Sequence, residues 1–338
     1  MPEKILVIQT AFLGDAILSL PFIQELKKKT NARIDVVTIP ENKEIFASCP
    51  ETLVIRVIDK NDTDNSLWAT IGFALSLRQF SYSKIYSLHR SFRSTLIAFL
   101  AGVKETYGYD SSSFAFAYKH TVPYRKDYHE VQRHLVFLKD NDLITNWRVL
   151  PEMLVNQDQY ENLQRVILGL KKDNRIIAIA PGSVWQTKRY PDVYYLKIID
   201  YFCNTGFNIV LLGGKNEMEL CNRLTVNKRV HNLAGKISTV ESRGVIGYAE
   251  LLLTNDSAST HIGMAANAKT LTIYCSTVPE FGFYPYNEKS DIISYTGLDC
   301  KPCGIHGHIE CPLGHFNCAH LLKPELVIEK MEKMIEGK

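Results

Sequence analysis

A single acid in an otherwise apolar run raises the first question of chemistry. Residues 5–18 read ILVIQTAFLGDAIL, and Asp15 directly follows Gly14. In open α/β sheets, ligands bind beyond the carboxyl ends of the strands. Gly14 permits a turn there, and Asp15 would project from the start of the next helix. Asp15 could be a helix N-cap, a common role for aspartate, or a catalytic base, and the spacing leaves both interpretations open.

Two loops in the second half of the chain could hold an anion. APGSVWQTKRYP, residues 180–191, offers backbone N–H groups together with Lys188 and Arg189, which suit a phosphate. LLTNDSASTHIGMAAN, residues 252–267, ends a strand and opens a helix whose free N–H groups attract negative charge. The alternatives are a solvated basic turn in the first loop, and a plain helix cap beside a core histidine in the second. The candidate residues of the second loop are Asp256, Ser257, Ala258 and His261.

A third loop places a carboxylate near a predicted helix start. In LLGGKNEME, residues 211–219, two glycines end a strand and Glu217 follows. Glu217 could accept hydrogen bonds from ribose or sugar hydroxyls, or simply stabilise the start of its own helix.

Several common motifs are absent from the sequence. It contains no GxGxxG, GxxxxGK[ST], GxSxG or HExxH. A dinucleotide-binding site, a P-loop kinase, a hydrolase elbow and a zincin are therefore not indicated. An acid on one half and an anion site on the other favour group transfer from a nucleotide donor.

The elements that must position these residues alternate between strands and helices. Buried strands such as KILVIQ and RIIAIA are each followed by amphipathic segments, which predicts parallel sheets with helices on both faces. The rhythm is lost over residues 105–128, where Phe114, Phe116 and Tyr118 could alternate in a buried strand or meet acyl chains. It restarts after residues 150–172, so the 338 residues predict two Rossmann-like domains. A last helix is predicted over 324–336.

Composition limits the partners and the location. The net charge of +3 is too small to indicate nucleic acid as a partner. Residues 5–23 are long enough to span a membrane, but Asp15 at a bilayer centre would cost about 2.5–3.5 kcal/mol. We therefore expect a cytoplasmic protein.

Four of the eight cysteines cluster near the end of the chain. CKPCGIHGHIECPLGHFNC holds them with three histidines between. A CxxC followed by two more thiols is a spacing that binds zinc. Reduced thiols are the alternative, and a disulfide is disfavoured in the cytoplasm. The residues concerned are Cys300, Cys303, Cys311 and Cys318.

The whole set of motifs resembles glycosyltransferase family 9, the lipopolysaccharide heptosyltransferases, and most closely its heptosyltransferase II branch. The opening strand with its Gly-Asp pair, LHRSFRSTLIAFLAGVKETYGYD and HEVQRHL resemble the acceptor-side segments. APGSVWQTKRYP, NLAGKIS, LLTNDSASTHIGMAA and CPLGH resemble the donor-side signatures. Each motif is loose by itself, but their common order along the chain is specific.

The resemblance implies an α/β GT-B fold, with two Rossmann-like domains facing across a cleft. Residues 1–155 would bind the acceptor, 172–320 the nucleotide-sugar donor, and the helix in 321–338 would return to the first domain. It also implies metal-independent, inverting transfer of L-glycero-D-manno-heptose from ADP-heptose to the Kdo/heptose inner core, without a cofactor. We expect a monomer, peripheral on the inner leaflet of the inner membrane, where the anionic lipopolysaccharide acceptor is presented. The alternatives are another nucleotide sugar, or a non-catalytic nucleotide-binding protein.

The resemblance also assigns roles to residues. Asp15 matches the general base and Lys188 the lysine at the donor phosphates. Asp256 matches the acid that holds the donor sugar, with Ser257, Ala258 and His261 around the diphosphate, and Glu217 a ribose contact. Arg90 and Arg93, after a strand end, would face the anionic acceptor. The family usually has glycine where this chain has Ala258, and a positive φ would cost alanine more than glycine.

Overall fold

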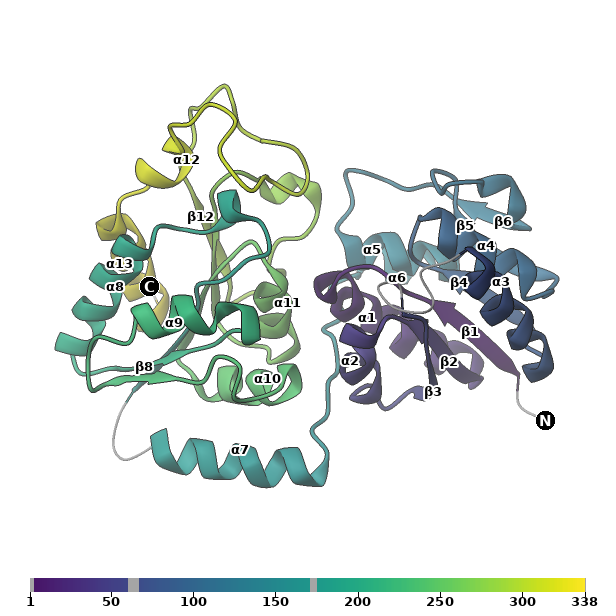
Figure 1. Cartoon of the computed structure of the whole chain (residues 1–338), viewed down its shortest axis with the longest axis horizontal. Helices are drawn as coiled ribbons and strands as arrows, with labels where there is room; N and C mark the ends of the chain where they lie inside the picture. Colours follow the sequence, from purple (N-terminus) through teal and green to yellow (C-terminus); the bar gives the residue numbers. More distant parts are fainter. Residues whose placement is uncertain (1–2, 60–66, 171–174, 338) are drawn as a thin grey trace. The chain divides into compact units, whose positions relative to one another are not determined.

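Two compact units make up the chain in a computed structural model, which describes residues 3–59, 67–170 and 175–337. Unit 1 is Met1–Leu154 and unit 2 is Val155–Lys338. Each unit holds one six-stranded sheet flanked by helices (Figure 1). The predicted α/β class with two successive βα halves is confirmed.

The sheet of unit 1 is parallel throughout and has the order β3-β2-β1-β4-β5-β6. After their first residues, Lys4 and Lys84, the central strands β1 and β4 are buried, as expected of strands covered by helices on both faces. The order reverses between β1 and β4, and ligands of doubly wound sheets bind beyond such a reversal. The strands are β1 (Lys4–Ile8), β2 (Arg33–Thr38), β3 (Thr52–Val57), β4 (Lys84–Ser87), β5 (Glu105–Tyr109) and β6 (His120–Val122).

The helices of unit 1 follow its strands. The longest, α1, has three lysines in its last turn and a left-handed C-cap at Asn31, both favourable at a helix end. It runs straight through Pro21 and packs against α5, whereas α3 packs against α4. The helices are α1 (Leu13–Thr30), η1 (Pro40–Asn42), α2 (Lys43–Ala47), α3 (Leu67–Ser76), η3 (Leu77–Phe80), α4 (Phe92–Leu100), η4 (Ala115–Ala117), α5 (Glu130–Leu135), η5 (Val136–Leu138) and α6 (Asn141–Thr145).

Unit 2 repeats the same topology. Its sheet has the order β9-β8-β7-β10-β11-β12, again parallel, and reverses between β7 and β10. The strands are β7 (Ile176–Ala180), β8 (Asn208–Leu211), β9 (Val230–Asn232), β10 (Leu251–Asn255), β11 (Thr270–Tyr274) and β12 (Asp291–Ser294). The helices are α7 (Gln157–Leu170), η6 (Gln186–Lys188), α8 (Asp192–Asn204), η7 (Lys215–Glu217), α9 (Met218–Arg223), α10 (Thr239–Tyr248), α11 (Ala258–Ala265), η8 (Pro279–Phe281), α12 (Asn317–His320) and α13 (Pro324–Glu336).

The C-terminal helix α13 is where the sequence predicts it, but the prediction that it returns to the first domain is wrong. Val327 and Met331 are fully buried in the core of unit 2, where α13 packs against α8. The Tyr201 hydroxyl donates to Glu332 at 2.6 Å, and Lys269 Nζ donates to the backbone oxygen of Met334 at 2.9 Å. The apolar face of α13 is therefore buried within the second unit.

No helix in the described ranges is long and apolar enough to cross a membrane.

Candidate active site

Asp15 lies at the carboxyl edge of the unit 1 sheet, one loop beyond β1. The helix begins at Leu13 with Phe12 in the N-cap position, so Asp15 is the third residue of α1. The interpretation of Asp15 as the N-cap is therefore wrong, and Gly14 is helical instead of forming the turn. Asp15 is half-buried in the first turn, where helical N–H groups favour a negative charge.

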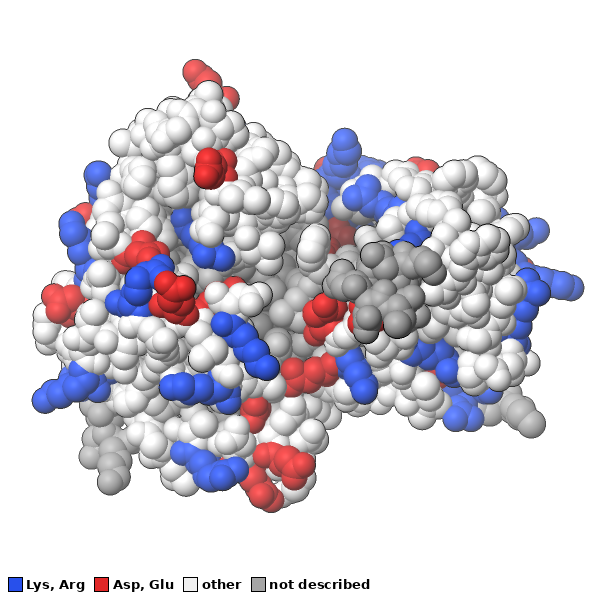
Figure 2. Space-filling model, viewed as in Figure 1, with Lys and Arg blue, Asp and Glu red and all other residues white. Residues whose placement is uncertain are grey.

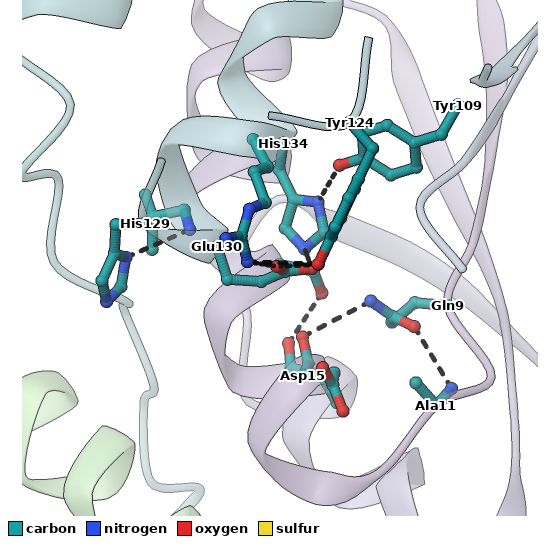
Figure 3. A network of polar contacts seen from close by, with 12 residues as sticks. Gln9, Ala11, Asp15, Tyr109, Tyr124, His129, Glu130 and His134 are labelled. Atoms are coloured by element: carbon teal, nitrogen blue, oxygen red, sulfur yellow. Dashed lines mark hydrogen bonds and ion pairs between the residues drawn. The ribbon is translucent and has the colours of Figure 1, made fainter. Parts of the chain in front are cut away.

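A buried glutamine shapes the loop that precedes Asp15. Gln9 is 1 % exposed; its Oε1 accepts from the Ala11 N–H at 3.2 Å. Its Nε2 donates to the backbone oxygen of Asp15 at 3.5 Å (Figure 3). The side chain of Gln9 therefore ties the end of β1 to the first turn of α1.

A buried polar network on α5 lies beside Asp15 (Figure 3). Arg133 Nη1 donates to Glu130 Oε2 at 2.7 Å, and the Tyr124 hydroxyl donates to the same oxygen at 3.1 Å. The Tyr109 hydroxyl contacts His134 Nδ1 at 2.8 Å, and His134 Nε2 lies 3.8 Å from Glu130 Oε1. Arg133 also donates to two backbone carbonyls, so its charge is fully solvated by the protein.

Burial sets the protonation of this network. Burial alone would raise the pKa of Glu130, but its basic neighbours, His134 and Arg133, hold that pKa below its usual range. Burial lowers the pKa of His134 to about 4, so the imidazole is neutral at physiological pH. Burial also raises the pKa of Tyr109, whose hydroxyl stays protonated and shares a hydrogen bond with His134 Nδ1. The buried groups next to Asp15 therefore include one cation, Arg133, and one anion, Glu130, which are hydrogen-bonded to each other.

The predicted acceptor residues Arg90 and Arg93 come from the end of β4 and the first turn of α4. The Arg90 guanidinium lies 3.7 Å above the Tyr124 ring, a cation–π contact. Because Tyr124 binds Glu130, Arg90 is joined through it to the network beside Asp15. Arg93 is half-buried at the same edge of the sheet. Two cations thus lie at the edge that carries Asp15.

In unit 2, Lys188 and Asp256 form an ion pair across the strand-order reversal. Lys188 ends η6 beyond β7, and Asp256 follows β10 directly. Their Nζ and Oδ2 atoms are 2.7 Å apart, and the Thr277 hydroxyl donates to the same Oδ2 at 2.6 Å. The sequence predicts both members of the pair, but it does not indicate Thr277, which is contributed by the loop after β11.

Asn255 holds the loop that carries Lys188. Its Oδ1 accepts from the N–H of Tyr190 and from the hydroxyl of Tyr195, both at 3.0 Å. Its Nδ2 donates to the backbone oxygen of Pro181 at 2.7 Å. This fully buried amide therefore fixes the 181–190 segment against the end of β10.

The start of α11 faces the same place. Ser257 is the N-cap, but no side-chain hydrogen bond caps the helix. Ala258 is the first helical residue, so the cost expected for alanine at a positive φ does not arise. His261 lies one turn along and is 4 % exposed. A helix start without a capping side chain next to Lys188 favours an anion.

Glu217 performs the structural role that the sequence leaves open, and it also borders the site. Its Oε2 accepts from the N–H of Gly214 at 2.8 Å, which stabilises the start of its own short helix. A Cβ at Gly182 would lie 2.3 Å from Glu217 Cγ, so the side chain rests on the backbone of the Lys188-bearing loop.

The cysteine-bearing segment reaches this site with a residue that sequence reasoning missed. His306 stacks on Trp185, with ring centroids 6.2 Å apart. Burial lowers the pKa of His306, Lys188 lowers it further, and Asp256 opposes the shift, so the imidazole lies within electrostatic reach of the pair. The next residues are tied down, since the His308 N–H donates to Thr187 Oγ1 at 2.7 Å. Only the tertiary fold brings this segment to the ion pair.

The four clustered cysteines do not form a metal site in the structure. Within the described part of the chain, no three His, Cys, Asp or Glu side chains are arranged as metal ligands. Cys303 Sγ instead contacts the backbone oxygen of Cys300 at 3.3 Å, and Cys311 Sγ accepts from the N–H of Phe316 at 3.4 Å. All four are free thiols, and burial raises the pKa of Cys303 and that of Cys318, the latter to about 11.

Comparison with known proteins finds relatives that match the chain over most of its length. Lipooligosaccharide heptosyltransferase 2 of Campylobacter jejuni is 27 % identical to this chain, with 98 % of the chain and 99 % of the relative covered. A family 9 glycosyltransferase structure from Veillonella parvula has a TM-score of 0.86 at 20 % identity, covering 99 % and 98 %. The structure of E. coli ADP-heptose LPS heptosyltransferase II has a TM-score of 0.80 at 20 % identity, covering 99 % of each. The model of glycosyltransferase family 9 (heptosyltransferase) matches residues 71–314. The chain therefore belongs to glycosyltransferase family 9.

Proposed function

We propose that this protein transfers L-glycero-D-manno-heptose from ADP-heptose to the inner core of lipopolysaccharide, with inversion and without a metal. The observation that carries the proposal is the Lys188–Asp256 pair beside the start of α11, at the strand-order reversal of unit 2. The Campylobacter jejuni relative and the E. coli structure are both named heptosyltransferases, and the E. coli structure is also named for ADP-heptose.

The donor half of the site suits a sugar diphosphate. Lys188 and the N–H groups at the start of α11 would bind the diphosphate, assisted by Ser257, Ala258 and His261. Asp256, next to Thr277, would accept hydrogen bonds from the sugar hydroxyls. Glu217, which rests on Gly182, would contact the ribose.

The acceptor half supplies the base. An acceptor hydroxyl oxygen attacks the anomeric carbon, its proton passes to Asp15, and the bond from that carbon to the diphosphate oxygen breaks. ADP leaves with the bonding electron pair from the opposite face, which inverts the anomeric centre. Asp15 in the first turn of α1 accepts the proton, while Lys188 and α11 stabilise the charge on the leaving ADP. These groups supply the positive charge that a metal would otherwise provide.

The acceptor chemistry determines where the protein would act. The inner core carries phosphates and sugar carboxylates, which Arg90 and Arg93 can bind at the edge that carries Asp15. Its lipid anchor places the acceptor at the inner face of the inner membrane, so we propose a monomer acting there as a peripheral protein.

A donor panel tests the proposal. Purified protein is incubated with a deacylated Kdo/heptose core acceptor and with ADP-heptose, ADP-glucose, UDP-glucose or GDP-mannose, and the product is followed by mass shift. We expect addition of one heptose from ADP-heptose alone, with the opposite anomeric configuration by NMR. Turnover with another donor instead would assign a different sugar to this family 9 member. Binding of ADP without turnover of any donor would show a non-catalytic nucleotide-binding protein.

A further inference from the structure

Three phenylalanines form an exposed cluster on unit 1. Phe92, Phe114 and Phe116 are 43 %, 56 % and 85 % exposed. The centroids of Phe92 and Phe114 are 5.2 Å apart, and those of Phe114 and Phe116 are 5.7 Å apart. We call these three residues the aromatic cluster. The sequence interpretation of Phe114 and Phe116 as alternating strand residues is wrong, because they flank and enter the short helix η4.

The backbone holds the cluster outward in an unusual conformation. Phe114 has a φ of 59°, in the left-handed region that bulky side chains disfavour. Hydrogen bonds fix this turn: the Ser113 N–H donates to the backbone oxygen of Arg90, and the Ala117 N–H to that of Phe114, both at 3.0 Å. A turn that is fixed by hydrogen bonds and exposes two phenylalanines to solvent indicates a surface that binds a partner.

Topology places the cluster at the edge of the sheet that carries Asp15. Phe92 begins α4 after β4, and the 113–117 turn follows β5, so both lie beyond the carboxyl ends of parallel strands. Two further exposed aromatic residues, Phe12 and Trp68, lie at helix starts beyond β1 and β3. Five exposed aromatic side chains of unit 1 therefore lie at the end where the acceptor would bind, although Phe99, at the end of α4, is exposed elsewhere.

The two segments that carry the cluster are rich in cations, although Asp110 and Asp127 border the second segment and Asp127 pairs with Arg125 at 2.8 Å. Residues 67–104 and 111–126 contain no Asp or Glu, although both segments contain Lys and Arg. Figure 2 shows blue side chains and no prominent red ones over the part of unit 1 that carries α3 and α4. Pairing with a second copy through this face would oppose cation to cation. Arg90, Arg93, Arg125 and Lys126 lie beyond the carboxyl ends of β4 and β6, at the edge that carries the cluster, whereas Lys84, Lys104 and Lys119 lie where β4, β5 and β6 begin, at the opposite edge.

Exposed aromatic side chains set among cations suit one kind of surface. Aromatic rings favour the boundary between headgroups and acyl chains, and Lys and Arg favour anionic headgroups. We propose that the aromatic cluster and the cations around it dock unit 1 on an anionic lipid bilayer. If the proposed function holds, this surface brings the protein to its lipid-anchored acceptor. Binding to lipid itself does not require heptose transfer.

Vesicle flotation of the full chain tests the docking. The probes are phosphatidylcholine vesicles with and without phosphatidylglycerol. We expect flotation with the anionic vesicles only, weakened by salt because exposed charges are screened. The double variant Phe114→Asn/Phe116→Ser should bind these vesicles about tenfold less tightly, and Asn tolerates the left-handed backbone at 114. Lys126→Glu should also weaken binding, whereas Leu168→Ser, a control on the equally exposed α7 surface, should not.

Each other outcome would overturn the docking proposal. Failure of the wild-type protein to float, or equal flotation of a folded double variant, would refute it directly. A wild-type dimer that the double variant abolishes would show that a second copy covers the cluster. Loss of transfer to a deacylated acceptor in the double variant would assign the cluster to the sugar-binding site. If the wild type floats as expected but transfers no heptose, only the proposed function fails.

Discussion

Lys188 Nζ lies 2.7 Å from Asp256 Oδ2, and both side chains are largely buried, at 13 % and 10 % exposure. A buried lysine paired with one carboxylate has a balanced charge before any ligand arrives. An incoming diphosphate would compete with Asp256 for the ammonium group. Asp256, still bound by Thr277, would then be available to the sugar hydroxyls. One ion pair can therefore couple phosphate binding to sugar recognition.

Lys188→Met should weaken ADP binding. A charge-assisted hydrogen bond contributes about 1.5–3 kcal/mol, so the Kd for ADP should rise about tenfold to a hundredfold. Isothermal titration calorimetry measures this change directly. Lys215→Met, on the neighbouring and exposed η7, is the matched control and should bind ADP as the wild type does. An unchanged Kd in Lys188→Met would remove Lys188 from the phosphate site.

Asp256→Asn should separate sugar recognition from nucleotide binding. It removes the carboxylate that competes with the phosphates for Lys188, so ADP affinity should be kept or rise. The KM for ADP-heptose should rise about tenfold, because a neutral amide accepts weaker hydrogen bonds than a carboxylate does. Calorimetry with ADP and initial-rate kinetics with the donor give the two values. Weakened ADP binding would contradict the competition between Asp256 and the phosphates.

Asp15→Asn should lower kcat at least about a hundredfold, as loss of a general base does. ADP affinity should not change, because the donor site belongs to unit 2. Steady-state transfer assays and calorimetry test the two halves. Asp127→Asn, an exposed carboxylate of unit 1, should keep wild-type kcat. Near wild-type turnover in a folded Asp15→Asn enzyme would exclude Asp15 as the base.

Periodicity in the sequence predicts the strongest elements of both units. The α1, α8 and α13 helices have a clear amphipathic period or terminal signals, and the buried strands β1 and β7 are continuous apolar runs. Two short strands of the 105–128 segment, β5 and β6, are not predicted from the sequence, because five and three residues carry little periodic signal. The α10 helix is missed, although the capping box formed by Ser238 and Glu241 is readable in the sequence.

The candidate site is predictable only where a residue follows its own strand. Asp256 follows its buried strand directly, and Asp15 and Lys188 lie in or after the loop beyond theirs, so their edge of the sheet can be inferred. Thr277 and His306 reach the ion pair from later loops, which no local pattern specifies. An amphipathic helix such as α13 likewise shows that one face is buried, but not which unit covers it.

Stability should fall with acid because His134 is buried in a neutral state. Its pKa is about 4 in the fold and near 6.5 when unfolded, so the unfolded chain binds the extra proton between these values. The free energy of unfolding should therefore decrease, by up to about 3 kcal/mol, as the pH drops from 6.5 to 4. His134→Gln should remove most of this slope in urea titrations at several pH values. The control is His320→Gln, which replaces an exposed histidine and should retain the wild-type slope. A wild-type slope in His134→Gln would show that the pH dependence of stability has another origin.

Two glycines of α10 should respond to alanine in opposite directions. A Cβ at Gly244 would lie 2.3 Å from Leu163 Cδ2 on α7, so Gly244→Ala displaces the buried Leu163 side chain, whereas a Cβ at Gly247 meets nothing within 4 Å. Overpacking costs about 1–3 kcal/mol, so Gly244→Ala should lower the Tm. Gly247→Ala should gain roughly 0.5–1 kcal/mol of helix propensity and raise it. Differential scanning calorimetry compares the two, and a shift of the same sign in both variants would show that α7 does not pack against α10 at Gly244.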